Sequence, residues 1–161
     1  TDYRLYEYCM MGGPIHTTYN GNDVLSPSLT WSSSTERLAA SAHWAAEKTV
    51  DFFYQALGRD GYNGSGGPLS IGLTSNPAYA GAALYAPSNI VIGPAPPGAS
   101  GPYVSLDVMG HEFTHAIIGN GLAYWESPAP STNPLVTFSA LWWRHTQSLL
   151  LGTITWERTF G

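Results

Sequence analysis

The sequence predicts an α+β fold, with a β-rich amino-terminal lobe that contains one long helix and ends in a second, apolar helix. Short runs of β-branched and aromatic residues alternate with Gly, Pro and Asn turn signals over residues 3–31 and 59–102. Residues 33–58 and about 106–119 instead carry apolar side chains at helical spacing. Strands and helices that occupy separate stretches of the chain are typical of the α+β class.

Short strands are expected within the first thirty or so residues. The segment "YRLYEYCMMGGPIHTTYNGNDV" mixes aromatic and Thr runs with Gly-Gly-Pro and Asn-Gly-Asn-Asp turn signals. Turn residues of this kind between β-prone runs favour short strands joined by tight turns.

Residues 33–58 form the clearest predicted helix. Ser33 and Glu36 have the spacing of a capping box, in which each side chain accepts a hydrogen bond from the other's backbone N–H. Small and apolar residues recur at helical spacing after them. Gly58 supplies a stop, because glycine adopts the left-handed conformation that ends many helices.

Residues 59–102 are rich in Gly, Pro, Ser and Asn, and three short apolar runs interrupt them. The runs "LSIGL", "AALYA" and "NIVIG" predict strands of a small sheet. A further helix begins near Ser105 or Asp107 and is closed by Gly119-Asn120-Gly121. Because this helix is apolar on most sides, we expect it to be buried between two layers of structure.

The composition limits the possible partners. The chain of 161 residues is long enough for one domain with a core. Lys and Arg total 6 against 11 Asp and Glu, a net charge of −5, which argues against a nucleic-acid partner. No apolar run reaches the roughly 18 residues of a membrane span, and the start "TDYRLYEY" is that expected of a mature protein or an internal fragment. The single Cys9 says little about the compartment.

The second helix carries the pattern H-E-x-x-H. His111 and His115 are four residues apart, so their imidazoles can converge on one cation. Glu112 lies about 100° further around the helix axis, where it can reach a water molecule bound to that cation. Such a set suits hydrolysis, because a zinc ion acidifies its water and the Glu accepts the proton.

The motif alone is only moderately specific, because His and Glu also pair without metal on solvated helix faces. Here the helix is otherwise apolar. Burying two His and one Glu costs free energy unless a partner compensates them. The metal interpretation is therefore favoured over a solvated helix face.

The flanking residues extend the motif to a family resemblance. "LDVMGHEFTHAIIGNGLAYWES" resembles the catalytic helix of the thermolysin-like neutral zinc metallopeptidases. "SAHWAAEKTVDFFYQALGRDGYNGSG" resembles the long helix and following turn of their amino-terminal lobe, and "GGPIHTTYN" one of the early hairpins. The resemblance implies that residues 1–127 are a partial peptidase domain that ends soon after the zinc-binding helix at about 106–119.

The resemblance also implies roles for single residues. His111 and His115 would bind zinc, and Glu112 would be the general base. The family holds the substrate backbone with an Asn-Ala pair on an edge strand, and Asn76 and Ala78 lie at about that place. Asp107 falls where the family has a calcium ligand. From the residues alone, Asn76 with the following Pro equally predicts a turn, and Asp107 equally predicts a helix N-cap.

Three other histidines receive no chemical role. His43 matches a core histidine of the family's long helix. His16 and His145 are expected to be surface or loop residues rather than ligands.

The third zinc ligand is missing from the protein sequence. In the family, a second helix bears E-S-G-A-L-N-E-S-F-S-D-I-F-G, and its inner Glu completes the zinc site. This chain has "ESPAPSTNPLVTFSALWW" instead, and the only later acid is Glu157. Since a zinc site of this kind needs a third protein ligand, the site as written is incomplete.

We interpret the loss as the result of a shifted reading frame. The residues 131–134, Ser-Thr-Asn-Pro, can be encoded TCA ACG AAT CCT, and one frame over the same letters spell AAC GAA TCC, which is Asn-Glu-Ser. Allowed codons for residues 127–140 give S-G-A-L-N-E-S-F-S-D-I-F-G-T without a break. We therefore expect that residues 128–161 are out of frame and form a poorly ordered tail, and that the helical second lobe is absent.

The resemblance implies a secreted zinc-dependent metalloendopeptidase that hydrolyses internal peptide bonds of proteins or peptides and is monomeric when intact. The polypeptide as written is expected to bind zinc weakly and to be inactive. The alternative is a catalytically dead, truncated relative that at most binds peptide or metal weakly. An unrelated structural domain with a chance H-E-x-x-H is a third possibility, which zinc content would test.

Overall fold

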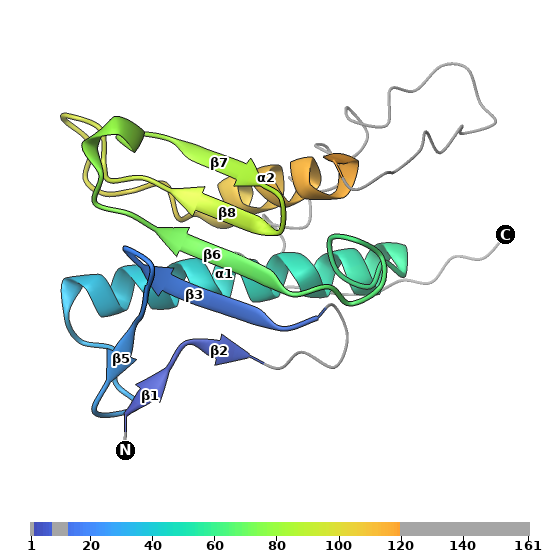
Figure 1. Cartoon of the computed structure of the whole chain (residues 1–161), viewed down its shortest axis with the longest axis horizontal. Helices are drawn as coiled ribbons and strands as arrows, with labels where there is room; N and C mark the ends of the chain where they lie inside the picture. The colour runs from blue at the N-terminus through green and yellow to red at the C-terminus, as the bar shows by residue number, and fades with distance from the viewer. Residues whose placement is uncertain (1, 8–12, 120–161) are drawn as a thin grey trace, which may run out of the picture. The chain divides into compact units, whose positions relative to one another are not determined.

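Figure 1 shows the computed structural model of the chain, which describes residues 2–7 and 13–119. The predicted α+β class is confirmed, since strands and two long helices occupy separate stretches. The short strands at the amino terminus are β1 (Tyr3–Arg4), β2 (Tyr6–Glu7), β3 (Ile15–Tyr19), β4 (Asn22–Asp23) and β5 (Leu25–Ser26). The later elements are α1 (Ser34–Leu57), β6 (Leu69–Leu73), a 3₁₀ turn (Pro77–Tyr79), β7 (Ala83–Ala86), β8 (Asn89–Ile92) and α2 (Leu106–Gly119).

The main sheet has the strand order β2-β3-β6-β8-β7, with β4 also paired to β3, and β1 pairs with β5 in a separate two-stranded sheet. Strands β3, β6 and β8 are parallel, and β2, β4 and β7 run antiparallel to their neighbours. The turn between β3 and β4 has Asn20 at φ 50° and Gly21 at φ 79°. Two positive φ angles in a two-residue hairpin loop are those of a type I′ turn, which the Asn-Gly pair favours.

Both helices pack on the same side of the sheet, α1 against β3 and β6 and α2 against β7 (Figure 1). Buried residues alternate with partly exposed ones along β6, β8 and the first part of β3, so one face of the sheet is buried beneath the helices. Its buried members are Ile15, Thr17, Leu69, Ile71, Leu73, Ile90 and Ile92.

Helix α1 begins and ends as its sequence predicts. The Ser33 side chain accepts a hydrogen bond from the Glu36 N–H, and the Glu36 carboxylate accepts hydrogen bonds from the N–H groups of Ser33 and Ser32. These two hydrogen bonds from backbone N–H groups lower the pKa of Glu36. The hydrogen bond from Ser33 has the larger effect, and the one from Ser32 the smaller. Gly58 closes the helix at φ 63°.

A buried histidine joins α1 to the sheet. The ring of His43 is hydrogen-bonded through Nδ1 to Thr17 Oγ1 of β3, at 2.8 Å. Its other nitrogen, Nε2, lies 3.2 Å from Glu47 Oε1 one turn along the helix. The expected core position of His43 is confirmed, and its contacts fix the register of α1 against β3.

Candidate metal centre

Helix α2 is held by its apolar side. Met109, Phe113 and Ala116 are at most 1% exposed. The Phe113 ring packs against Phe53 of α1 with ring centroids 5.0 Å apart. At the end of the helix, a Cβ added to Gly119 would lie 3.2 Å from the Tyr85 ring of β7, so glycine lets β7 approach α2 closely.

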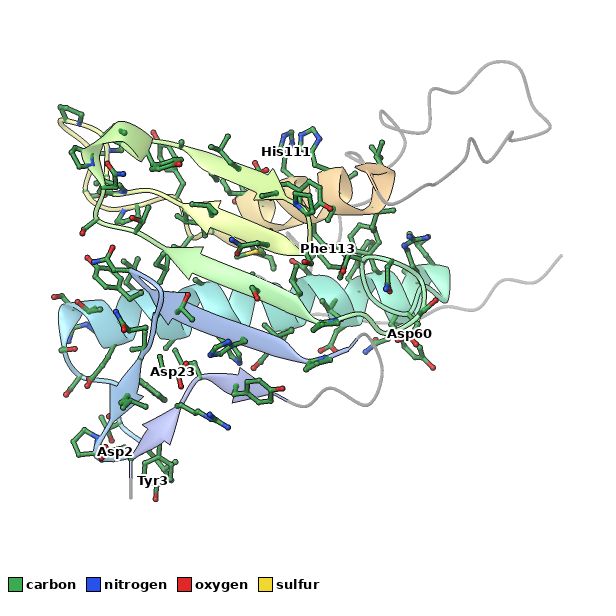
Figure 2. All side chains as sticks on the ribbon, viewed as in Figure 1. Asp2, Tyr3, Asp23, Asp60, His111 and Phe113 are labelled. Atoms are coloured by element: carbon green, nitrogen blue, oxygen red, sulfur yellow. The ribbon has the colours of Figure 1, made fainter. Side chains whose placement is uncertain are left out.

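The two histidines of the motif lie on the opposite side of α2. Both are exposed, and Figure 2 shows His111 pointing away from the side that carries Phe113. Their Nε2 atoms are 3.0 Å apart, and the rings meet at 78° with centroids 4.7 Å apart. The helical spacing therefore brings the two nitrogens together.

The described residues supply one of the two layers that were expected to cover α2. Only one layer, formed by α1 and β7, covers the helix, on its Phe113 side. On the other side His111 and His115 are exposed, and Ile118 is 46% exposed. The apolar composition of α2 exceeds what one layer can cover.

Glu112 lies between the two sides and is only 7% exposed. Within the part of the chain that the structure describes, its carboxylate has no hydrogen-bond or ion-pair partner. Glu residues are seldom this buried, so this position is unusual for a Glu with a purely structural role.

The His pair fits part of a zinc site. Two nitrogens that are each about 2.0–2.1 Å from one zinc ion must lie within about 4 Å of each other, and the observed 3.0 Å meets this condition. Among residues 2–7 and 13–119, however, no group of three or more His, Cys, Asp or Glu could hold a metal ion. The described residues thus bring together two imidazoles that could bind a metal ion, with Glu112 next to His111 in the sequence.

Comparison with known proteins places this helix in a family. The model of the thermolysin metallopeptidase catalytic domain matches residues 2–119, which end with α2. The chain belongs to the thermolysin metallopeptidase family. The match includes both helices and the whole main sheet.

Curated relatives agree with this assignment. The bacillolysin of Bacillus amyloliquefaciens is 30% identical over 98 residues, which cover 60% of this chain and 19% of the relative. Neutral protease NprE of Bacillus pumilus is 31% identical over 98 residues, covering 60% of this chain and 32% of the relative. The chain therefore matches a third or less of the length of these two thermolysin-family proteins.

A solved structure supports the fold. The precursor of protealysin, a metalloproteinase from Serratia proteamaculans, aligns with a TM-score of 0.58 and 18% sequence identity. The alignment covers 86% of this chain and 44% of that one. At this identity the likeness concerns the fold alone.

The expected edge-strand position of Asn76 and Ala78 is wrong. Asn76 caps the 3₁₀ turn, where its Oδ1 accepts a hydrogen bond from the Ala78 N–H at 3.0 Å. The Asn-Pro sequence therefore forms the turn that was its alternative interpretation. A side chain bound to its own turn cannot also hold a substrate without giving up that bond.

Asp107 is the second residue of α2, because the helix begins at Leu106. It is therefore not the N-cap. Its exposed carboxylate lies in the first turn, where it interacts favourably with the positive end of the helix dipole. Its calcium-binding role remains a prediction.

The position of β7 at the edge of the sheet was not predicted from the sequence. Among the described strands, β7 ends the sheet and pairs only with β8. The apolar run that includes β7 was predicted as a strand, but nothing local marks it as the edge next to α2.

Of the other two histidines, the structure describes His16 but not His145. His16 lies within β3, half-exposed, with Nε2 2.6 Å from Asp23 Oδ1, which agrees with a surface role. His145 and the tail 128–161 lie outside the described residues. Within residues 2–7 and 13–119, no helix is long and apolar enough to cross a bilayer.

Proposed function

We propose that this chain carries two zinc ligands and the general base of a secreted zinc-dependent metalloendopeptidase, and that the polypeptide as written does not turn over. The observation that carries the proposal is the convergence of His111 and His115, with Nε2 atoms 3.0 Å apart, beside the buried Glu112. The family assignment of residues 2–119 supports it.

The residues of α2 would act as follows. His111 and His115 would hold the zinc ion through Nε2. When bound, zinc acidifies a water molecule and polarises the carbonyl of the scissile peptide bond. Glu112, which is only 7% exposed, would accept the proton of that water.

The third ligand would come from the shifted reading frame. One frame over, codons allowed for residues 127–140 include Asn-Glu-Ser at the place where the family has its third zinc ligand. The observation that favours the rival, a catalytically dead chain, is that the described residues contain no third ligand near the pair. Both statements hold together if the protein as written is inactive and its frame-restored form is active.

As a monomer at low protein concentration, the chain as written is expected to lose zinc on dialysis and to leave casein uncut, because two imidazoles hold zinc less tightly than three protein ligands do. Zinc content after dialysis against a weak chelator and peptide release from casein measure the two effects. Stoichiometric zinc together with cleavage at the rate of an intact family member would contradict the proposal.

The substrate is proposed to be an extended peptide that pairs with β7. The carbonyl of Ala82 accepts a hydrogen bond from the Gly93 N–H on the β8 side. Backbone groups alternate along a strand, so the N–H and C=O of Ala83 and Tyr85 face the open edge. An open edge next to a catalytic helix can bind a peptide as an added strand.

Ala83→Pro tests this proposal in the frame-restored chain. Proline removes the N–H that faces the open edge but leaves the bonds to β8, and edge strands tolerate it there. We expect KM for a peptide substrate to rise by about tenfold, the effect of one lost hydrogen bond of about 1–1.5 kcal/mol. Leu84→Ala is the matched control, because it trims an exposed side chain and keeps the backbone donor. Equal KM values for the two variants would exclude β7 as the substrate edge.

Secretion, a calcium ion at Asp107 and a monomeric intact enzyme remain proposals that rest on the family assignment. Calcium binding at Asp107 predicts that Asp107→Asn lowers the calcium dependence of thermal stability.

A further inference from the structure

We propose that His111 and His115 form half of a four-imidazole zinc site, which a second copy of this chain completes. This inference rests on the proposed zinc binding of the same pair. It concerns the polypeptide as written and makes the zinc ion a bridge between two chains rather than a catalytic centre.

One His pair supplies only two of the ligands that a zinc ion needs. Structural zinc sites are almost always tetrahedral, with four protein ligands. The pair supplies two imidazole nitrogens, 3.0 Å apart. The described residues provide no third His, Cys, Asp or Glu at the site. A second pair of the same kind supplies the missing two ligands.

The His pair is accessible to a second chain. His111 and His115 are exposed, so a partner can approach them without unfolding either chain. Ile118 follows on the same stripe of α2 and is 46% exposed. Two helices that cross at their His pairs would therefore also remove apolar surface from water. The pair lies opposite the side that packs on α1, so the dimer leaves the core unchanged.

The net negative charge of the chain opposes dimerisation in the absence of metal. Each chain has a formal net charge of −5, so two copies repel each other without metal. A zinc ion between neutral imidazoles adds two positive charges at the contact and offsets part of this repulsion. Dimerisation should therefore require zinc and should strengthen with salt, which screens the remaining repulsion.

One carboxylate competes with this arrangement. Asp107 is exposed and lies one turn before His111, on the same stripe as both histidines. If it were a ligand, one chain could use three groups of its own. Possible ligands outside the described residues are Cys9, Glu126, His145 and Glu157.

The test is a zinc titration of the full chain, followed by native mass spectrometry and sedimentation velocity. We expect one zinc ion per two chains, a doubling of the 17.3 kDa mass, and complete reversal by EDTA. His111→Ala and His115→Ala should each raise the zinc concentration for half-dimerisation by about 100-fold, because each removes two of four ligands from the dimer.

Two control variants should form the zinc-dependent dimer at the same zinc concentration as the parent, measured without calcium. One is Asp107→Asn, and the other combines Cys9→Ser, Glu126→Gln, His145→Ala and Glu157→Gln. Circular dichroism of each variant confirms that the fold is kept.

The possible outcomes separate this inference from the proposed function. One zinc ion per monomer, or a loss of binding in either control variant, overturns the shared site but leaves zinc binding by the pair intact. No zinc binding at any ratio overturns both. Dimers that persist in EDTA or in the His variants are not bridged by zinc and also overturn the inference.

Discussion

Glu112→Gln in the frame-restored chain is expected to lower kcat by about 10²–10⁴-fold, the usual contribution of a general base. The amide has nearly the same shape as the carboxylate but does not accept the proton of the attacking water. Zinc content should stay unchanged, because His111 and His115 are both exposed and their Nε2 atoms approach each other without a contact to Glu112. Steady-state kinetics on a peptide substrate, together with metal analysis, measures both effects.

Asp51→Asn is a suitable control for that variant. It also replaces a carboxylate with an amide, but Asp51 is on α1, paired with Lys48 at 3.1 Å. Its kcat should equal that of the parent. If Glu112→Gln kept full activity, Glu112 would have no part in the reaction.

Phe113→Ala is expected to cost about 3–5 kcal/mol of unfolding free energy, as removal of a buried aromatic ring usually does. Phe113 is 0% exposed, and its ring contacts Phe53 with centroids 5.0 Å apart, so its loss leaves a cavity where α2 meets α1. A loss of this size is a large fraction of the stability of a small domain. Urea denaturation followed by tryptophan fluorescence measures the change.

Ile118→Ala is the matched control on the same helix. Ile118 is 46% exposed, so its truncation should change the unfolding free energy by no more than about 0.5 kcal/mol. Similar losses for both variants would show that α2 is not held by its Phe113 side.

The parts of the fold that depend on local sequence were predictable. The capping box at Ser33 and the glycine stop at Gly58 gave the bounds of α1, and all the contacts involved are within five residues of each other. The strand order β2-β3-β6-β8-β7 was not predictable, because parallel pairing joins segments that are far apart in the sequence.

In the candidate site, too, the features set by local sequence were predictable and those set by long-range packing were not. The approach of His111 to His115, and the position of Glu112 beside them on the helix, follow from helical spacing alone. They could therefore be predicted from the sequence. The position of β7 at the edge of the sheet depends on strand pairing that is not local, whereas the local Asn76-Pro77 sequence forms a turn rather than the edge strand that the resemblance implied. The one-sided burial of α2 depends on what packs around it, which its own periodicity does not contain.

We propose that the third zinc ligand is encoded in a shifted reading frame that follows the codons of the two-histidine helix. The most direct measurement is the nucleotide sequence of an expressed transcript around the Glu126 codon. We expect independent reads to contain one additional nucleotide there, so that the following codons spell Ser-Gly-Ala-Leu-Asn-Glu-Ser. Independent reads that instead encode "SPAPSTN" without interruption would contradict the claim.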